Sequence, residues 1–302
     1  MKEIVVLSGK GGTGKTTVVA ALAHLAAAEG RLAMADADVD AANLGLVLGP
    51  TPLAEQDFHG GHLAKIDLAL CTSCGACEEA CRFGALAPDG EAYQVDPVAC
   101  EGCAACMYRC PAQAISMEEQ LAGKWYAADT RFGPLIHAHL FAGQENSGKL
   151  VTLVKKQARE LGQSREYDYL LVDGPPGIGC PVIAACAGAD LALLVTEPTV
   201  AGAHDLERAL ATAEHFGVKS LVCINKCDLN PARAREIEGF CREAGIPVVG
   251  RIPFDVAVTE AMVQAKAVTE CVDGAVGREI RQLWANVKEA LGADDQARAG
   301  SG

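Results

Sequence analysis

Short apolar runs alternate with longer stretches of helical periodicity along most of the chain. The first run, residues 4–7, is rich in β-branched residues and ends in a glycine-rich turn. An alanine-rich stretch, residues 15–29, follows the turn and stops at Gly30, a residue typical of helix ends. A second apolar run, residues 32–35, leads into an acidic segment. Together these segments predict one strand–helix–strand unit with a glycine loop after its first strand.

The same alternation returns in the second half of the chain. We predict four more strands there, at residues 168–173, 191–196, 219–225 and 247–250. The helices between and around them are predicted near residues 148–161, 180–188, 203–216, 231–244 and 274–291. Strands that alternate with helices predict an α/β fold, a doubly wound and mostly parallel sheet covered on both faces.

The alternation is lost in the middle of the chain. Proline, glycine and histidine appear from about Pro50, and a cysteine-rich segment follows that ends near Met117. We read this part as an insert and expect residues 124–141 to form two short strands around Gly133 and Pro134 that rejoin the main domain. The predicted division is a discontinuous α/β domain of residues 1–57 and 119–292, an inserted domain of residues 58–118, and a loose tail of residues 293–302.

The composition of the chain narrows the range of functions that it can have. The chain has 302 residues, 50% of them hydrophobic, and a net charge of −13. Such an acidic chain is a poor candidate for binding nucleic acid or anionic membranes through a basic surface. It has no apolar run long enough for stable membrane insertion and no export signal at Met1, so we expect a soluble, cytoplasmic protein. Most of the 14 cysteines fall between residues 71 and 110, which favours metal or cluster binding over disulfides.

Residues 9–16, Gly-Lys-Gly-Gly-Thr-Gly-Lys-Thr, match the phosphate-loop pattern G-x-x-x-x-G-K-[ST]. They lie between a predicted strand and a predicted helix, where backbone N–H groups can surround phosphate oxygens. Lys15 can reach the β- and γ-phosphates, and the Thr16 hydroxyl can bind Mg²⁺. The predicted nucleotide-binding residues of the loop are Gly11, Gly12, Thr13, Gly14, Lys15, Thr16 and Thr17.

A second lysine, Lys10, stands near the start of this loop. With it, the loop resembles the deviant Walker A motif of the MinD/ParA/Mrp superfamily of P-loop ATPases. The resemblance implies that Lys10 reaches across an ATP-dependent homodimer, or a heterodimer with a paralogue, to the phosphates of the partner. It also implies ATP as cofactor and an ATPase activity that is slow and stimulated by a partner.

Two further segments are similar to that superfamily. Residues 36–44 resemble its first switch, in which Asp38 matches the aspartate that orients the attacking water; Asp36 and Asp40 are competing candidates. Residues 170–177 look like Walker B and the second switch, where Asp173 would hold Mg²⁺ through water.

The segment Asn225-Lys226-Cys227-Asp228 follows a predicted strand where such sheets present base-reading residues. Asn225 can pair with adenine, whereas Asp228 in this local motif can accept from guanine. The local motif favours GTP, and the resemblance of the whole chain favours ATP.

Two cysteine runs have the spacing C-x₂-C-x₂-C-x₃-C of bacterial ferredoxins. In two-cluster ferredoxins the fourth cysteine of each run binds the other cluster, so we predict two [4Fe–4S] clusters with crossed ligands. Zinc is the alternative to iron–sulfur clusters. A proline follows the last cysteine of the second run, whereas Arg82 stands at the equivalent place after the first run. The predicted ligands are Cys71, Cys74, Cys77 and Cys110 for one cluster and Cys81, Cys100, Cys103 and Cys106 for the other. Cys180 lies shortly after Asp173, where the nitrogenase iron protein has a bridging-cluster cysteine, and whether it binds a cluster stays open.

The sequence therefore predicts a MinD-like P-loop ATPase with an inserted two-cluster ferredoxin domain. Our first hypothesis for its function couples a nucleotide-dependent dimer switch to electron transfer through the clusters. The alternatives are an ATPase scaffold that delivers Fe–S clusters or metal to a client, and a positioning ATPase with a structural ferredoxin module. The expected partner is a redox or Fe–S client protein, without nucleic acid.

Overall fold

The computed structural model describes residues 1–144 and 147–299, and the chain forms two compact units. The first unit comprises Met1–Gln56, Trp125–His139 and the chain from Ser147 on. The second unit comprises Asp57–Lys124 and the segment that starts at Leu140. The second unit contains the segment that the sequence analysis assigns to an insert.

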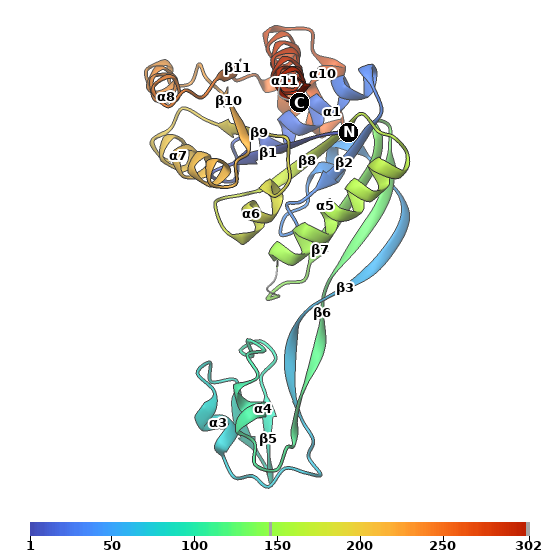
Figure 1. Cartoon of the computed structure of the whole chain (residues 1–302), viewed down its shortest axis with the longest axis vertical. Coiled ribbons are helices and arrows are strands. Elements are labelled where there is room, and N and C mark those ends of the chain that lie inside the picture. The colour runs from blue at the N-terminus through green and yellow to red at the C-terminus, as the bar shows by residue number, and fades with distance from the viewer. Residues whose placement is uncertain (145–146, 300–302) are drawn as a thin grey trace. The chain divides into compact units, whose positions relative to one another are not determined.

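A nine-stranded sheet has the order β11-β10-β9-β1-β8-β2-β7-β6-β3 (Figure 1). From β11 to β7 every neighbouring pair of strands is parallel, as the alternation of strands and helices predicted. These strands are β1 (Lys2–Ser8), β2 (Leu32–Asp36), β7 (Gly133–Leu140), β8 (Tyr169–Pro176), β9 (Leu191–Thr196), β10 (Lys219–Asn225) and β11 (Val248–Ile252). β1, β8 and β9 are buried along nearly their whole length, which explains the apolar runs at residues 4–7, 170–172 and 191–195.

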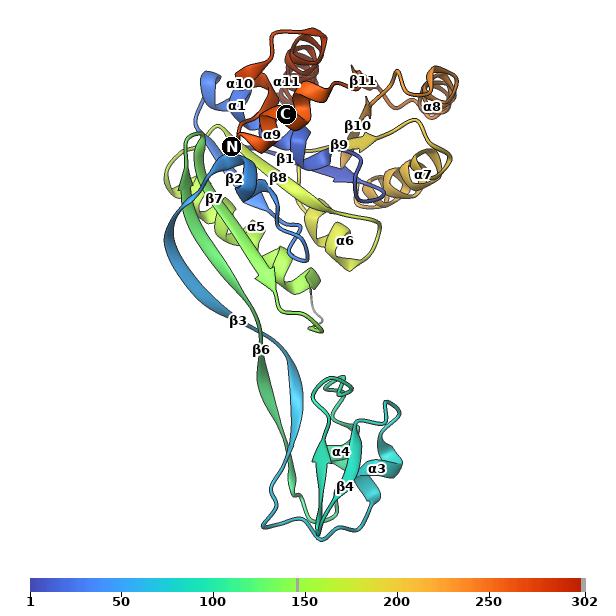
Figure 2. The ribbon, with the colours of Figure 1, turned by 180° about the vertical axis from the view of Figure 1, so that it is seen from behind.

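Helices cover both faces of the sheet (Figures 1 and 2). On one face lie α1 (Lys15–Glu29), α2 (Leu44–Leu48), α9 (Val256–Val263), α10 (Val268–Cys271) and α11 (Ala275–Ala299). On the other lie α5 (Ser147–Ser164), α6 (Cys180–Cys186), α7 (Val200–His215) and α8 (Pro231–Glu243). The doubly wound α/β architecture predicted from the sequence is confirmed in this unit.

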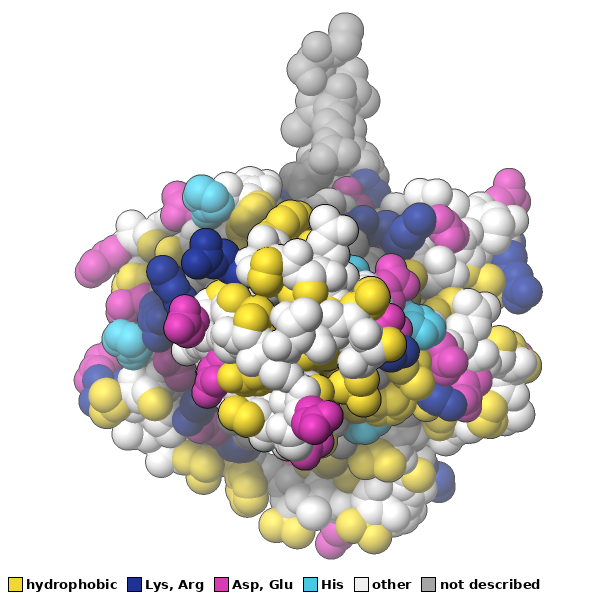
Figure 3. Space-filling model, turned by 90° about the horizontal axis from the view of Figure 1, so that it is seen from below, with side chains coloured by type: hydrophobic (Ala, Val, Ile, Leu, Met, Phe, Trp, Pro, Cys, Tyr) yellow, Lys and Arg dark blue, Asp and Glu magenta, His cyan; other side chains and the backbone are white. Residues whose placement is uncertain are grey.

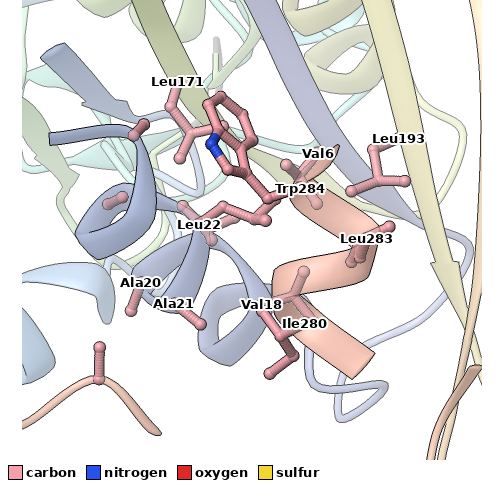
Figure 4. Close-up of a cluster of buried hydrophobic side chains, with 14 of the residues drawn as sticks. Val6, Val18, Ala20, Ala21, Leu22, Leu171, Leu193, Ile280, Leu283 and Trp284 are labelled. Atoms are coloured by element: carbon pink, nitrogen blue, oxygen red, sulfur yellow. The ribbon is translucent and has the colours of Figure 1, made fainter. Parts of the chain in front are cut away.

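The main hydrophobic core lies between α1, α11 and the sheet (Figure 4). Val18 and Leu22 of α1 point toward Ile280, Leu283 and Trp284 of α11. These residues occur at helical spacing, so each helix presents one apolar face to the core. This packing holds the start of α1, and with it the glycine loop, against the sheet.

Two strands are longer than the sequence analysis predicted. No strand was predicted where β3 (Thr51–Ile66) lies, and the first of the two short strands predicted in residues 124–141 is part of the longer β6 (Ile115–Thr130), whereas β7 forms the second. Both β3 and β6 have 16 residues and run from one unit into the other. The predicted loose tail from residue 293 begins inside α11, which continues to Ala299; residues 300–302 lie outside the described residues.

The second unit is built from two similar halves. Each half has one short helix, α3 (Ala76–Ala80) or α4 (Ala105–Arg109), and β4 (Leu86–Asp89) pairs with β5 (Ala92–Val95). Its small core combines Ala64, Leu86 and Ile115 with cysteine side chains. Several large hydrophobic residues of this unit stay exposed, and hydrophobic side chains are visible among polar ones in the view from below (Figure 3). A core this small gives the unit few apolar contacts of its own.

None of the helices in the described part of the chain combines the length and the apolar character needed to cross a membrane.

Candidate nucleotide site and cysteine cavities

The glycine loop connects the end of β1 to the start of α1. Gly12 and Gly14 have φ angles of 81° and 89°, a left-handed conformation that favours glycine. A Cβ atom on Gly14 would also lie 2.2 Å from Nδ2 of Asn225. The backbone angle therefore favours glycine at this position, and the Asn225 amide at the end of β10 would have to move to admit a Cβ atom.

A cavity of about 880 Å³ opens beside the loop. Its lining includes every predicted nucleotide-binding residue of the loop, namely Gly11, Gly12, Thr13, Gly14, Lys15, Thr16 and Thr17. Asp38 and Asp40 from the predicted first switch also line it, together with Pro175 and Pro176 after Walker B. The structure thus brings three segments that are distant in sequence to one cavity.

Lys15 is buried at the centre of this site and interacts with two carboxylates. Its Nζ contacts Oδ1 of Asp173 and lies 3.8 Å from Oδ2 of Asp38. Among the described residues, Oδ2 of Asp173 is buried without a hydrogen-bond partner. A buried carboxylate oxygen left unpaired fits a role in holding a cation such as Mg²⁺ beside the Thr16 hydroxyl.

The neighbouring aspartates of the first switch have different surroundings. Asp36 is fully buried and accepts hydrogen bonds from the backbone N–H groups of Asp38 and Leu44 at 3.2 and 3.0 Å. Burial raises the pKa of Asp36 well above its ordinary value, and the charge of Asp173 adds to this effect. Asp36 therefore positions the backbone of the switch, whereas Asp38 faces the cavity.

A smaller cavity of about 200 Å³ adjoins the loop through Gly12, Gly14 and Thr17. Asn225 lines it, and its Nδ2 donates a hydrogen bond to the Thr13 carbonyl at 2.7 Å. Asp228 is not part of the lining, and its Oδ1 accepts a hydrogen bond from the backbone N–H of Phe254 at 2.7 Å. The carboxylate that favoured GTP in the local motif therefore lies outside the cavity that Asn225 lines.

Lys10 does not line the cavity but pairs with Glu197, just after β9. The distance from Lys10 Nζ to Glu197 Oε1 is 2.7 Å, and Glu197 Oε2 lies 3.1 Å from Nζ of Lys226. Burial raises the pKa of Glu197, but the two lysines outweigh this effect and the pKa is lowered. The sequence analysis missed Glu197 as part of the site; its place after a central parallel strand was the available signal.

Two further cavities lie in the second unit, each surrounded by four cysteines. One is lined by Cys71, Cys74, Cys77 and Cys110, and the other by Cys81, Cys100, Cys103 and Cys106. These are the two crossed sets that the ferredoxin spacing predicts. Within the described residues, no group of three or more His, Cys, Asp or Glu side chains is arranged to hold a single metal ion.

Backbone angles repeat between the two cysteine runs. Ser73 and Gly102 occupy equivalent places with φ of 51° and 62°, and so do Gly75 and Ala104 with φ of 77° and 62°. A Cβ atom on Gly102 would lie 2.3 Å from the carbonyl oxygen of His62, so this position requires glycine. The left-handed residues turn each run around its cavity.

Cys180 is exposed at the start of α6. A Cβ atom on Gly148 would lie 3.4 Å from the Cβ of Cys180, and among the described residues Cys180 belongs to no group of three or more His, Cys, Asp or Glu side chains that could hold a metal ion. The hypothesis that Cys180 binds a bridging cluster stays untested.

Comparison with known proteins assigns the family. Residues 4–268 match the model of the family described as "CobQ/CobB/MinD/ParA nucleotide binding domain". The chain belongs to this family. The MinD/ParA part of the predicted resemblance is therefore confirmed, whereas this description does not mention an inserted ferredoxin domain.

Individual relatives agree with this assignment. An uncharacterized protein of Methanocaldococcus jannaschii is 31% identical over 292 residues, which cover 96% of this chain and 97% of that protein. The septum site-determining protein MinD of Bacillus subtilis is 28% identical over 217 residues, covering 70% of this chain and 59% of that protein. The crystal structure of the Pyrococcus furiosus cell division ATPase MinD has a TM-score of 0.59 at 18% identity, with 96% and 99% of the two chains covered. Members of the MinD/ParA family are ATPases, and this chain has their fold and phosphate loop.

Hydrolysis by this MinD/ParA-family chain is expected to fall as the pH is lowered through about 6. Burial raises the pKa of Asp38 to about 6, although the charge of Lys15 opposes the shift. Asp38 is charged above this pKa and can orient a water, and it loses that ability once protonated below it. The check is the hydrolysis rate at saturating ATP from about pH 5 to about pH 8, where ordinary carboxylates stay ionised. A rate that is flat across this range would contradict the role given to Asp38.

ATP is expected to bind about tenfold or more tightly than GTP, the discrimination that one good base contact provides. Asn225 lines the smaller cavity beside the loop, whereas Asp228 does not and uses its Oδ1 to accept the backbone N–H of Phe254. Displacement of a labelled ATP analogue by unlabelled ATP and GTP measures the preference. Asp228→Asn keeps an acceptor for Phe254 and should leave the preference unchanged; equal displacement by GTP in the wild type would overturn the assignment.

Proposed function

We propose that this chain is an ATP-driven switch of the positioning class, in which bound ATP favours a dimer and hydrolysis returns the monomer. The observation that carries the proposal is the arrangement of Lys15, Asp38 and Asp173 around the large cavity. Lys15 would neutralise phosphate charge and Asp38 would orient the attacking water. Thr16 and Asp173 would hold Mg²⁺, which stabilises charge on the transferred phosphoryl group when bound.

The likeness to MinD proteins supports a positioning role better than the electron-transfer role that the sequence analysis placed first. Relatives along much of the chain carry the name septum site-determining protein MinD. One similar solved structure is a complex of MinC with MinD from Aquifex aeolicus, which favours a protein partner for this chain too. A homodimer, or a heterodimer with a paralogue, agrees with the place of Lys10 in the loop.

The distribution of a fluorescently tagged chain in its native cells tests the positioning role. The wild type is expected to concentrate at changing places in the cell, because hydrolysis keeps resetting the switch. Asp38→Asn should bind ATP without hydrolysing it and should therefore stay at fixed places. A uniform distribution of both proteins would contradict the proposal, and an Asp190→Asn variant tests for general effects of removing a carboxylate.

The cysteine cavities favour a second function for the same chain, the binding of two [4Fe–4S] clusters. Each cavity has four thiol-bearing residues, the number that one such cluster requires. Cys110 Sγ also accepts a hydrogen bond from the Ala114 N–H at 3.3 Å, the type of contact that tunes cluster potential. When bound, the clusters would supply one-electron chemistry toward a redox or Fe–S client. A complete ligand set supports stable clusters rather than cargo for delivery.

A further inference from the structure

Lys10 is held inside its own subunit. Its side chain is 31% exposed, and its Nζ lies 2.7 Å from Glu197 Oε1 and 3.4 Å from the Thr199 hydroxyl oxygen. Glu197 and Thr199 both follow β9 and are far from Lys10 in the sequence. In this conformation the ammonium group of Lys10 is already engaged by a carboxylate and a hydroxyl.

The carboxylate of Glu197 is shared with a second lysine, Lys226. Lys226 Nζ lies 3.1 Å from Glu197 Oε2 and donates a hydrogen bond to the Gly12 carbonyl at 3.0 Å. The φ of Lys226 is 54°, a left-handed angle that is uncommon for residues other than glycine. Glu197, 15% exposed, thus links the start of the glycine loop to the segment after β10.

We propose that Glu197 is a latch that holds Lys10 within its own subunit and releases it when the ATP-bound dimer forms. The inference rests on the proposed function, in which Lys10 reaches the phosphates of the partner subunit. To reach a phosphate of another subunit, the Lys10 side chain has to leave the position in which Glu197 and Thr199 hold it against its own subunit. The latch therefore lowers the affinity of the dimer and sets the protein concentration at which ATP can assemble it.

Lys226 lowers the free-energy cost of separating Lys10 from Glu197. A buried carboxylate that loses its only cation is strongly destabilised. Glu197 keeps Lys226 when Lys10 leaves, so its charge stays paired. The latch can accordingly open and close without disrupting the fold around the loop.

Amine labelling of the nucleotide-free chain tests the latch directly. Labelling rates of individual lysines are measured by mass spectrometry in the wild type and in Glu197→Gln, which keeps the shape of the side chain but removes its charge. Lys10 is expected to react about fivefold faster in the variant, the upper value for a partly exposed ion pair. Lys156 and Lys288, which pair with other carboxylates, should not change. An unchanged rate at Lys10 would overturn the proposal.

Sedimentation with ATP tests the consequence for the dimer. Two latches open for each dimer, so Glu197→Gln should lower the dimer dissociation constant by up to about thirtyfold. Glu236→Gln removes the partner of a surface arginine and serves as the matched control, with no change expected. Equal or weaker dimerisation of Glu197→Gln would overturn the latch. If neither protein dimerises with ATP, the proposed function fails, and labelling of Lys10 alone decides whether the latch exists.

Discussion

Replacing Lys10 with alanine is expected to leave ATP binding nearly intact but to abolish the ATP-dependent dimer. Lys10 does not line the phosphate cavity of its own subunit, so its loss removes no direct contact there. Hydrolysis should fall by about a thousandfold or more, the typical value of a cation supplied to the transferred phosphate by another subunit. Binding of a fluorescent ATP analogue, sedimentation with ATP and the rate of phosphate release measure the three effects separately.

Two variants make this prediction specific. Lys15→Ala should lose nucleotide binding itself, because Lys15 lines the cavity and is buried against Asp173. Lys156→Ala removes an exposed lysine of α5 and should behave as the wild type. A Lys10→Ala protein that hydrolyses ATP at the normal rate would show that Lys10 has no role in the partner subunit.

Anaerobic reconstitution with iron and sulfide is expected to load about eight irons per chain. Replacing one cysteine of either run with alanine should lower this number by about four. The crossed sets make a sharper prediction. Cys77→Ala and Cys110→Ala come from different runs but line the same cavity, so both should lose the same cluster. Cys81→Ala should lose the other one. Iron analysis and the electron paramagnetic resonance spectrum of the remaining reduced cluster identify which cluster is lost.

Cys186→Ala is the matched control, since this cysteine is buried in the first unit, outside both cavities. It should keep all of the iron. The deciding comparison is between Cys110→Ala and Cys106→Ala, which lie in the same run but line different cavities. If the spectra of the clusters that remain in these two variants were the same, each run would bind its own cluster and the crossed assignment would be wrong. Bound zinc without iron would reject the cluster proposal.

The parallel sheet and the phosphate loop could be predicted because their signals are local. Residues 9–16 carry the loop pattern by themselves, and residues 170–172 of β8 and 191–195 of β9 are apolar runs. The long strand β3 could not be predicted in the same way. Most of its first half is exposed, and it contains Pro52 and two adjacent glycines, so its sequence lacks an alternating pattern. Its regular structure depends on pairing with β6, which is distant in sequence.

The candidate site, too, could be predicted from the sequence only in part. Lys15 and the eight cysteines were predicted from spacing within short motifs and Asp38 from the resemblance to the MinD/ParA/Mrp superfamily; in the structure these residues line the large cavity and the two cysteine cavities. The contacts of Glu197 with Lys10 and Lys226 depend on three loops that only the folded sheet brings together. Asp228 shows the opposite case, since its motif indicated base recognition but the residue lies outside the lining of the cavity beside the loop.

The strand order of the sheet has a consequence for biosynthesis. β8 lies between β1 and β2 and is encoded after the whole Asp57–Lys124 segment of the second unit. On the ribosome, the cysteine-bearing segment therefore emerges before the strand that completes the centre of the nucleotide unit. Because domains generally fold as units during synthesis, the second unit can fold while β1 and β2 still lack their shared neighbour. Nascent chains of increasing length should thus acquire protease resistance in the second unit first.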